Sequence, residues 1–348
     1  MSQMDAVVLE EWGGDLAVQT VDRPEPEAGE VRVDVRACAV TRTIENAVQG
    51  GLSDDPAHTP RIPGHEFAGV VDAIGPGVSN VEVGDRVLAY FYLTCGRCDR
   101  CRRGDTNQCL NFGGWFGVHR DGAYAEATTI PAANVLPLPD GASFAAGAVA
   151  TDGLATPLHI CEKTDVGDDD TVLVIGGGGR IGLHLSKLAA ARGAHVLAAD
   201  VRRDRLDHLD AVTPDAVTPV DARESDLAAR LADETPDGRG PTVAVDTVGD
   251  VDTLGDAWDA LAMGGQVVTL TTHHERSFAP PLRAFVERET TIRGSRYATK
   301  DEVVRAARLL ADGRVTADYG DAVGLSDVPE VHRDLRHGDT AGVRILEP

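Results

Sequence analysis

The segment from Thr171 to Asp200, TVLVIGGGGRIGLHLSKLAAARGAHVLAAD, constrains the fold of this chain more than any other. The apolar run from Val172 to Ile175 predicts a buried strand, the glycines after it predict a tight turn, and apolar residues at helical spacing follow. A second apolar run then ends at Asp200. Strand, turn, helix and strand in this order are the unit from which parallel α/β sheets are built.

The glycines of this turn fit the pattern G-x-G-x-x-G. They allow a tight turn and a close approach of the backbone to a pyrophosphate, which then lies at the N-terminus of the helix. Asp200 comes eighteen residues after Gly182, where an acid is expected to bind the ribose of the cofactor. The predicted dinucleotide site consists of Gly177, Gly179, Arg180, Ile181, Gly182, Asp200 and Arg202.

Asp200 also bears on the choice between NAD and NADP. Its carboxylate suits the 2′-hydroxyl of NAD and repels the 2′-phosphate of NADP. Arg202 and Arg203 follow and could offset the repulsion, but arginines at the start of a helix are commonly solvated surface charges. The sequence therefore favours NAD.

Strand and helix patterns keep alternating after Asp200, through TVAVDTVGD, DTLGDAWDALAMGG, QVVTLTT and TTIRGS. This alternation predicts a Rossmann dinucleotide-binding domain over residues 153–293. His273 and His274 follow one of these strands, and we expect them to be loop residues and not ligands. Residues 1–152 contain short β-runs between Gly and Pro turns, which predict a compact β-rich domain. A length of 348 residues also favours two domains.

Four of the six cysteines lie in the stretch CGRCDRCRRGDTNQC, from Cys95 to Cys109. The spacing C-x2-C-x2-C-x7-C lets one loop surround a tetrahedral ion, and four thiolates leave zinc no open position, which is typical of a structural site. Disulfides here would need adjacent, strained pairs in a reducing compartment. An iron–sulfur cluster could use the same thiolates, but nothing else indicates electron transfer. We therefore expect structural zinc on Cys95, Cys98, Cys101 and Cys109.

The charge of the chain excludes some partners. Acidic residues number 56 against 33 basic ones, the net charge is −23, and the acids are scattered along the chain. Lysine occurs only at Lys163, Lys187 and Lys300. Such a surface repels nucleic acid and anionic lipid, and we expect a halophilic source, the alternative being an acidic protein from a GC-rich genome. Without a span-length apolar run or a secretory signal, we expect a cytoplasmic protein with a small-molecule substrate.

The stretches PGHEFAGVV, VEVGDRV, the cysteine loop and GAYAE occur in this order. This series resembles the zinc-containing medium-chain dehydrogenase/reductase family, the relatives of alcohol dehydrogenase, over nearly the whole chain. The resemblance implies an α/β protein with a GroES-like catalytic domain, residues 1–152 and 294–348, interrupted by the Rossmann domain. It also implies a structural zinc lobe at residues 95–109 and a homodimer or homotetramer.

The resemblance implies a second, catalytic zinc site. Gly64-His65-Glu66 matches the family's G-H-E, and ATDGLATPLH resembles a stretch that places Asp152 as a further ligand, with Glu66 as the additional candidate. Thr43 is implied to relay the proton of a bound alcohol, which makes Thr43, His65 and Asp152 the expected catalytic residues. Arg42 is implied to contact the pyrophosphate.

Two residues of RACAVTRTIEN depart from the family. Thr41 stands where a cysteine usually binds the catalytic zinc, and Ile44 stands where an acid usually orients the histidine. A hydroxyl is a poor zinc ligand compared with a thiolate, and the loss of the acid weakens the site further. The retained His65 and Asp152 argue for a metal, and Cys38 could approach the site, although it could equally be a small buried residue.

Three functions follow from these residues. The first is an NAD(P)-dependent alcohol dehydrogenase or carbonyl reductase with zinc as Lewis acid. The second is a catalytic-zinc-free enoyl or quinone reductase, in which Thr41, Thr43 or His65 would donate a hydrogen bond to the oxyanion. The third is a nucleotide-sensing protein without catalysis, which the intact glycine pattern disfavours.

Overall fold

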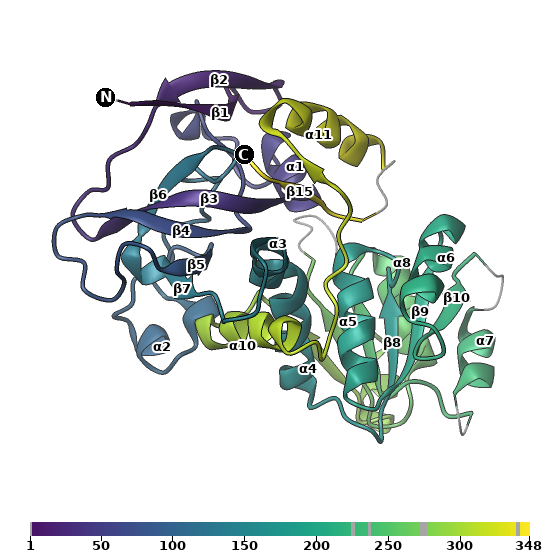
Figure 1. The fold of residues 1–348 in the computed structure, drawn as a ribbon. Coiled ribbons are helices and arrows are strands. Elements are labelled where there is room, and N and C mark those ends of the chain that lie inside the picture. Colours follow the sequence, from purple (N-terminus) through teal and green to yellow (C-terminus); the bar gives the residue numbers. More distant parts are fainter. Residues whose placement is uncertain (1, 224–226, 236–237, 272–276, 339–341) are drawn as a thin grey trace. The chain divides into compact units, whose positions relative to one another are not determined.

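The structure, a computed structural model, describes residues 2–223, 227–235, 238–271, 277–338 and 342–348 (Figure 1). His273 and His274 lie outside the described residues. The chain divides into two compact units. Unit 1 comprises Met1–Asp152, Ala298–Gly313 and Ala317–Pro348, and unit 2 comprises Gly153–Tyr297 and Arg314–Thr316. No helix within the described ranges is long and apolar enough to cross a membrane.

Unit 2 is a parallel sheet with helices between its strands, and it confirms the predicted α/β class. The strand order is β10-β9-β8-β11-β12-β13. Strands β9 and β10 therefore follow on one side of β8, and β11, β12 and β13 follow on its other side. Ligands of such sheets bind where this reversal occurs. The strands are β8 (Thr171–Ile175), β9 (His195–Asp200), β10 (Thr218–Asp221), β11 (Val243–Asp246), β12 (Gln266–Thr269) and β13 (Thr291–Gly294).

The helices of unit 2 cover this sheet with apolar residues. Leu173 of β8 and Val267 of β12 share one buried core with Leu254 and Trp258. Both strands at the centre, β8 and β11, are buried along their whole length, as a continuous apolar run predicts. The helices are α4 (Ala155–Thr164), α5 (Arg180–Ala191), α6 (Arg203–Val212), α7 (Leu227–Glu234), α8 (Val251–Ala260) and α9 (Leu282–Glu287).

The turn between β8 and α5 has glycines at positions where a side chain would clash with neighbouring atoms. Gly176 has a φ of 75°, in the left-handed region. A Cβ on Gly177 would lie 2.6 Å from the Cβ of Ala198, and one on Gly182 would lie 2.3 Å from the carbonyl oxygen of Gly176. Because all these positions lack a side chain, α5 can begin directly against the strands.

Unit 1 is built around the long strand β3, which pairs with β4, β6 and β15. The larger sheet has the order β14-β15-β3-β4-β5-β7, and β1 and β2 form a separate pair. The strands are β1 (Gln3–Leu9), β2 (Leu16–Asp22), β3 (Glu30–Val40), β4 (Phe67–Ile74), β5 (Arg86–Ala89), β6 (Ala127–Pro131), β7 (Val135–Pro137), β14 (Ala322–Val323) and β15 (Arg344–Leu346). The end of the chain therefore completes a sheet begun near its start.

The helices of unit 1 include both early and late segments of the chain. In the described residues they are α1 (Arg42–Val48), α2 (Asp99–Arg102), α3 (Phe144–Val149), α10 (Lys300–Ala311) and α11 (Val328–His337). Shorter turns are η1 (Pro56–His58), η2 (Thr106–Gln108), η3 (Ala132–Asn134), η4 (Ala150–Leu154, a π-helical turn) and η5 (Leu325–Asp327). Helix α11 packs against α1.

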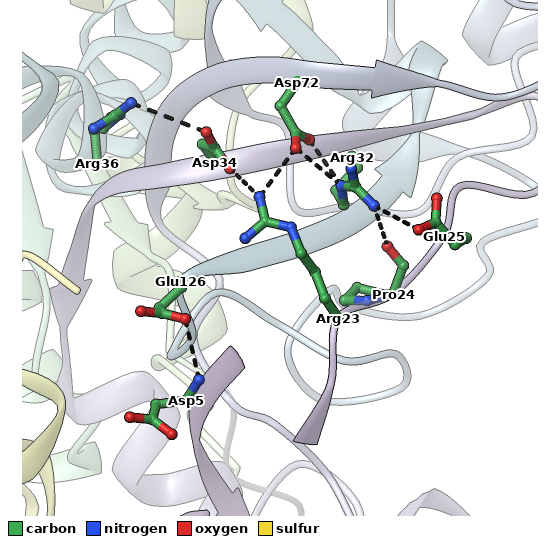
Figure 2. A network of polar contacts seen from close by, with 9 residues as sticks. All are labelled: Asp5, Arg23, Pro24, Glu25, Arg32, Asp34, Arg36, Asp72 and Glu126. Atoms are coloured by element: carbon green, nitrogen blue, oxygen red, sulfur yellow. Dashed lines mark hydrogen bonds and ion pairs between the residues drawn. The ribbon is translucent and has the colours of Figure 1, made fainter. Parts of the chain in front are cut away.

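Arginine–carboxylate pairs join β3 and β4 where these strands carry charged side chains, as Figure 2 shows. Arg23 binds both Asp34 of β3 and Asp72 of β4, and Arg32 donates to Asp72 at 2.9 Å. Burial alone would raise the pKa of Asp72, but the bonds from Arg32 and Arg23 outweigh it and lower this pKa. Arg23 can join two carboxylates because one terminal nitrogen of its guanidinium carries two N–H donors, and both bonds come from this nitrogen.

Candidate functional site

The four predicted cysteines come together in the loop after β5. Their sulfur atoms all lie within 4.8 Å of one another, and all six cysteines of the chain are free thiols. Four thiolates on one zinc ion would be about 3.8 Å apart, so only small shifts separate this cluster from tetrahedral coordination. Disulfides are absent from these described positions.

Backbone N–H groups surround the sulfurs. Cys95 donates to the Sγ of Cys109 at 3.3 Å, Cys98 to that of Cys95 at 3.4 Å, and Cys101 to that of Cys98 at 3.5 Å. The N–H groups of Arg97 and Cys98 lower the pKa of Cys95 to about 5. Burial, together with Cys98 and Cys109, raises the pKa of Cys101 to about 12. A divalent cation would relieve this crowding of thiolates, so the residues fit zinc.

The cysteine loop is attached to helix α10 of the same unit. The Tyr90 hydroxyl is buried 3.0 Å from the Thr106 hydroxyl and donates to the Ala298 carbonyl at 2.9 Å. The backbone N–H of Lys300 donates to the Thr106 hydroxyl at 3.1 Å. An ion that orders the loop would therefore also stabilise the start of α10.

A second cluster joins His65 and Glu66, just before β4, with Asp152 in the π-helical turn η4. Their ligand atoms lie within 4.8 Å of one another, and the His65 Nε2 lies 3.4 Å from the Glu66 Oε1. His65 is 2%, Glu66 0% and Asp152 9% exposed. Two buried carboxylates beside an imidazole need a proton or a cation to balance their charge. π-Helical turns are frequent at functional sites.

Thr41 supplies a buried polar atom at the end of β3. Thr41 is 1% exposed, and its Oγ1 has no hydrogen-bond partner among the described residues. The Ala39 N–H donates to the Glu66 carbonyl at 2.8 Å, and side chains alternate along a strand, so Thr41 and Glu66 belong to the same face of the sheet. A buried hydroxyl without a partner is costly unless an ion or a water completes it. The donor set therefore fits a cation.

The other sequence-predicted residues near this cluster play no part in it in the described structure. Cys38 is a fully buried thiol whose pKa is raised well above its usual value by burial and by Glu66. Ile44 is buried, and Phe91 sets the edge of its ring against His65, with centroids 4.5 Å apart. The immediate surroundings of His65 are thus partly apolar.

Arg42 and Thr43 lie at the first turn of α1 and are both exposed. The Arg42 guanidinium donates to the backbone carbonyl of Leu335 in α11. The structure therefore brings His65, Glu66 and Asp152 together but leaves Arg42 and Thr43 on the surface of a neighbouring helix.

The sequence did not predict a role for three further buried polar residues. Glu45, Tyr124 and His332 are each at most 3% exposed, and His332 is hydrogen bonded to both Glu45 and Tyr124. Tyr124 belongs to the GAYAE stretch that carries the family resemblance, but its spacing gives no signal for a histidine 208 residues later.

In unit 2 the predicted cofactor residues gather around one turn. Gly177 and Gly179 belong to the turn after β8, and Gly182 lies inside α5, which begins at Arg180 and Ile181. Asp200 ends β9 and is 5% exposed. Its two carboxylate oxygens accept from the backbone N–H groups of Gly178 at 3.1 Å and Arg202 at 2.9 Å. These bonds fix the carboxylate beside the glycine turn.

The guanidinium of Arg202 faces another acid. It donates to both carboxylate oxygens of Asp204, at 3.1 Å and 2.6 Å. This pair lowers the pKa of Asp204. Arg202 therefore contacts the Asp200 carboxylate with its backbone, and its charge is directed to Asp204.

Two family models match this chain. The alcohol dehydrogenase GroES-like domain matches residues 27–140, and the zinc-binding dehydrogenase model matches residues 181–312. The chain is 31% identical to an alcohol dehydrogenase of Geobacillus stearothermophilus over 345 residues, 99% of each chain. It is 24% identical to the acryloyl-coenzyme A reductase of Metallosphaera sedula over 348 residues, again 99% of each.

A solved structure shows the same likeness to alcohol dehydrogenases. The crystal structure of an NAD-dependent alcohol dehydrogenase superimposes with a TM-score of 0.87 and is 30% identical, covering 99% of this chain and 100% of that one. The likeness thus extends over both units.

Replacing Cys98 by Ser should release the zinc of the cysteine loop and lower the melting temperature, because three thiolates and a hydroxyl hold the ion far less tightly than four thiolates. Zinc content and thermal unfolding of the purified protein measure both effects. The control is Cys161→Ser, since Cys161 is a buried thiol in α4 of unit 2 and is not one of the four clustered cysteines. Equal zinc contents for Cys98→Ser and wild type would contradict the assignment.

Proposed function

Because the chain belongs to the zinc-containing medium-chain dehydrogenase/reductase family and is an NAD(P)-dependent oxidoreductase of the alcohol dehydrogenase type, we propose that its chemistry takes place at the cluster of His65, Glu66 and Asp152. The reaction is hydride transfer between the nicotinamide and an alcohol, or the aldehyde or ketone formed from it. The observation that carries the proposal is the set of three buried ligand atoms within 4.8 Å of one another, together with the buried Thr41 hydroxyl, which has no hydrogen-bond partner in the part of the chain that the structure describes.

We assign catalysis to residues 1–152 and 294–348 and cofactor binding to residues 153–293. The two ligand clusters in unit 1 and the glycine turn in unit 2 support this division. NAD, when bound, accepts or donates the hydride at its nicotinamide ring. The backbone N–H groups at the start of α5 would hold its pyrophosphate, since the helix dipole favours an anion there.

In the proposed site each residue of the cluster has a separate task. His65, Glu66 and Asp152 would hold a zinc ion, which would supply a Lewis acid for the substrate oxygen. The Thr41 hydroxyl can donate a hydrogen bond to an oxygen in the site, a task that a thiolate at this position could not perform. We assign to the Thr43 Oγ the transfer of the alcohol proton towards solvent, which its exposed position on α1 supports.

The second candidate is a reductase of activated double bonds that works without catalytic zinc. It is favoured by the absence of a thiolate at Thr41 and by the likeness to an acryloyl-coenzyme A reductase. In that reaction Thr41 or His65 would donate to the oxyanion formed at the carbonyl oxygen. The zinc content of the protein distinguishes the two candidates.

We propose that the preferred cofactor is NAD. Asp200 is fixed by two backbone N–H groups, so it cannot easily turn away from a 2′-phosphate. The charge of Arg202 is taken up by Asp204 and offers such a phosphate little compensation. The 2′-hydroxyl of NAD, by contrast, can donate to the carboxylate.

We further propose a cytoplasmic homodimer or homotetramer from a halophilic source. Strand β13 is an edge of its sheet, and four apolar residues at and near it are exposed: Met263 (73%), Leu282 (76%), Val286 (64%) and Ile292 (39%). An exposed strand edge with apolar neighbours favours pairing with a second copy. The excess of 56 acidic over 33 basic residues supports the halophilic source.

Sedimentation and thermal unfolding at low and at molar salt test these statements together. Salt screens the repulsion among the acidic side chains, so the melting temperature and the dimer fraction should both rise with salt. A monomer at every salt concentration would contradict the assembly, and a melting temperature that is independent of salt would contradict the halophilic source.

The purified protein should contain two zinc ions per chain, and a chelator should remove one of them first. The weaker ion is the one at His65, because nitrogen and oxygen ligands hold zinc less tightly than four thiolates. His65→Ala should remove this ion only. Thr41→Cys should slow its release by about tenfold or more, since it adds a thiolate.

Zinc analysis during chelator treatment measures these changes. One zinc per chain in the wild type, located in the cysteine loop, would favour the zinc-free reductase. If in addition His65→Ala leaves alcohol oxidation intact, metal catalysis is excluded for this chain.

Replacing Asp200 by Gly should lower kcat/KM for NAD by about tenfold or more, because a charged hydrogen-bond acceptor for the ribose is lost. The same change should improve the use of NADP only modestly, since Arg202 remains bound to Asp204. The double variant Asp200→Gly/Asp204→Ala frees Arg202 and should use NADP best. Steady-state kinetics with both cofactors measures this order, and Asp204→Ala alone is the control. Unchanged cofactor ratios in all three variants would show that Asp200 does not contact the ribose.

A further inference from the structure

A chain of buried hydrogen bonds runs between α11 and the segments that carry the metal cluster. The His332 Nδ1 lies 2.8 Å from the Glu45 Oε2, and its Nε2 lies 3.2 Å from the Tyr124 hydroxyl. Arg336 donates to the other Glu45 oxygen at 2.8 Å and closes the outer end. Glu45, His332 and Tyr124 are 3%, 1% and 0% exposed, so water does not compete with these bonds.

The donors and acceptors of this chain fit one arrangement. Burial alone would raise the pKa of Glu45, but the bonds from His332 and Arg336 outweigh it and lower this pKa, so the carboxylate is ionised and only accepts. His332 therefore donates from Nδ1. When the ring is neutral, its Nε2 accepts from the Tyr124 hydroxyl. Each polar side-chain atom of Glu45, His332 and Tyr124 then has a partner.

The inner end of these hydrogen bonds, Tyr124, contacts the segment just before His65. The Tyr124 ring occupies the space above Gly64, where a Cβ would lie 2.5 Å from the ring Cδ1, and the Tyr124 N–H donates to the Pro63 carbonyl at 3.0 Å. The neighbouring Ala123 N–H donates to the Gly64 carbonyl at 3.0 Å. Tyr124 and its neighbour thus hold Pro63 and Gly64, the two residues before His65.

The position of the acid on α1 is part of the argument. Ile44 stands where the family resemblance would place an acid that orients the histidine, and it is buried and apolar. The neighbouring Glu45 is one residue further along the helix, so its side chain points about 100° away, to His332 in α11. The carboxylate on α1 is therefore directed to His332 and, through His332, to Tyr124.

We propose that Tyr124, held by His332 and Glu45, is a positioning residue that keeps His65 where an ion requires it. Its hydroxyl is anchored by His332, its ring packs on Gly64, and its backbone N–H holds the Pro63 carbonyl. Helix α11, from the end of the chain, is thereby part of the site. The inference rests on the proposed metal site at His65, Glu66 and Asp152.

The test is Tyr124→Phe in the full-length protein, which removes the hydroxyl and keeps the ring. Release of zinc to a chromogenic chelator should be about tenfold faster for the weaker ion, because groups that orient metal ligands typically contribute that much to affinity. Release from the cysteine loop should not change. Tyr90→Phe is the matched control, since it also removes a buried hydroxyl with two partners in unit 1, and these partners, Thr106 and the Ala298 carbonyl, belong to neither Gly64 nor the metal cluster.

A double-mutant cycle tests whether the residues act as one chain. Glu45→Gln should speed release of the weaker zinc in the wild type. In the Tyr124→Phe background it should add less than twofold, because residues that act through one another are not additive. Additive effects of Glu45→Gln and Tyr124→Phe would overturn the proposed linkage.

The outcomes separate this inference from the proposed function. A wild type with one zinc overturns the metal site, and the inference with it. Two zinc ions in the wild type with unchanged release in Tyr124→Phe leave the metal site intact and overturn the inference alone. Equal acceleration in Tyr124→Phe and Tyr90→Phe, accompanied by equal loss of melting temperature, would mean that both hydroxyls only support the fold, and it would overturn the inference too.

Discussion

Strand β3 is the element on which the rest of unit 1 depends. It pairs with β6 over its first half, with β4 over most of its length and with β15 at its end. Its last hydrogen bonds bring Thr41 beside Gly64-His65-Glu66, and α1 begins at the next residue. A slip of one residue in this pairing would turn Thr41 and Glu66 to opposite faces. The candidate site is thus fixed first by sheet register and then by side-chain contacts.

Features confined to short segments could be predicted from the sequence. The cysteine cluster could be predicted because all four sulfurs lie within the fifteen residues from Cys95 to Cys109, which keeps them close together. The strand, turn and helix around Gly177 and Gly182 are equally local, and their prediction agrees with the structure of β8 and α5. Yet the left-handed residue of that turn is Gly176, which the motif does not include. A pattern of glycines does not tell which one makes the turn.

Contacts between distant segments could not be predicted. His65 and Asp152 were paired only through the family resemblance, and their closeness depends on the π-helical turn η4, which has no sequence signature. Nothing in the sequence around Tyr124 indicates His332, because the two meet only after α11 has packed against α1. Similarly, two acids follow one another closely at Asp200 and Asp204, and only the structure shows that Arg202 directs its charge to the second.

The return of the chain to β3 affects how the protein can be made. During synthesis β3, β4 and β6 leave the ribosome long before β15, so the edge of β3 that β15 covers stays open until the last residues appear. Unit 2, apart from Arg314–Thr316, is complete by then and can fold as a unit. Glu45 and Tyr124 likewise lack their hydrogen-bond partner His332 until α11 has been synthesised. The buried hydrogen bonds that join α11 to Glu45 and Tyr124 are therefore among the last contacts of unit 1 to form.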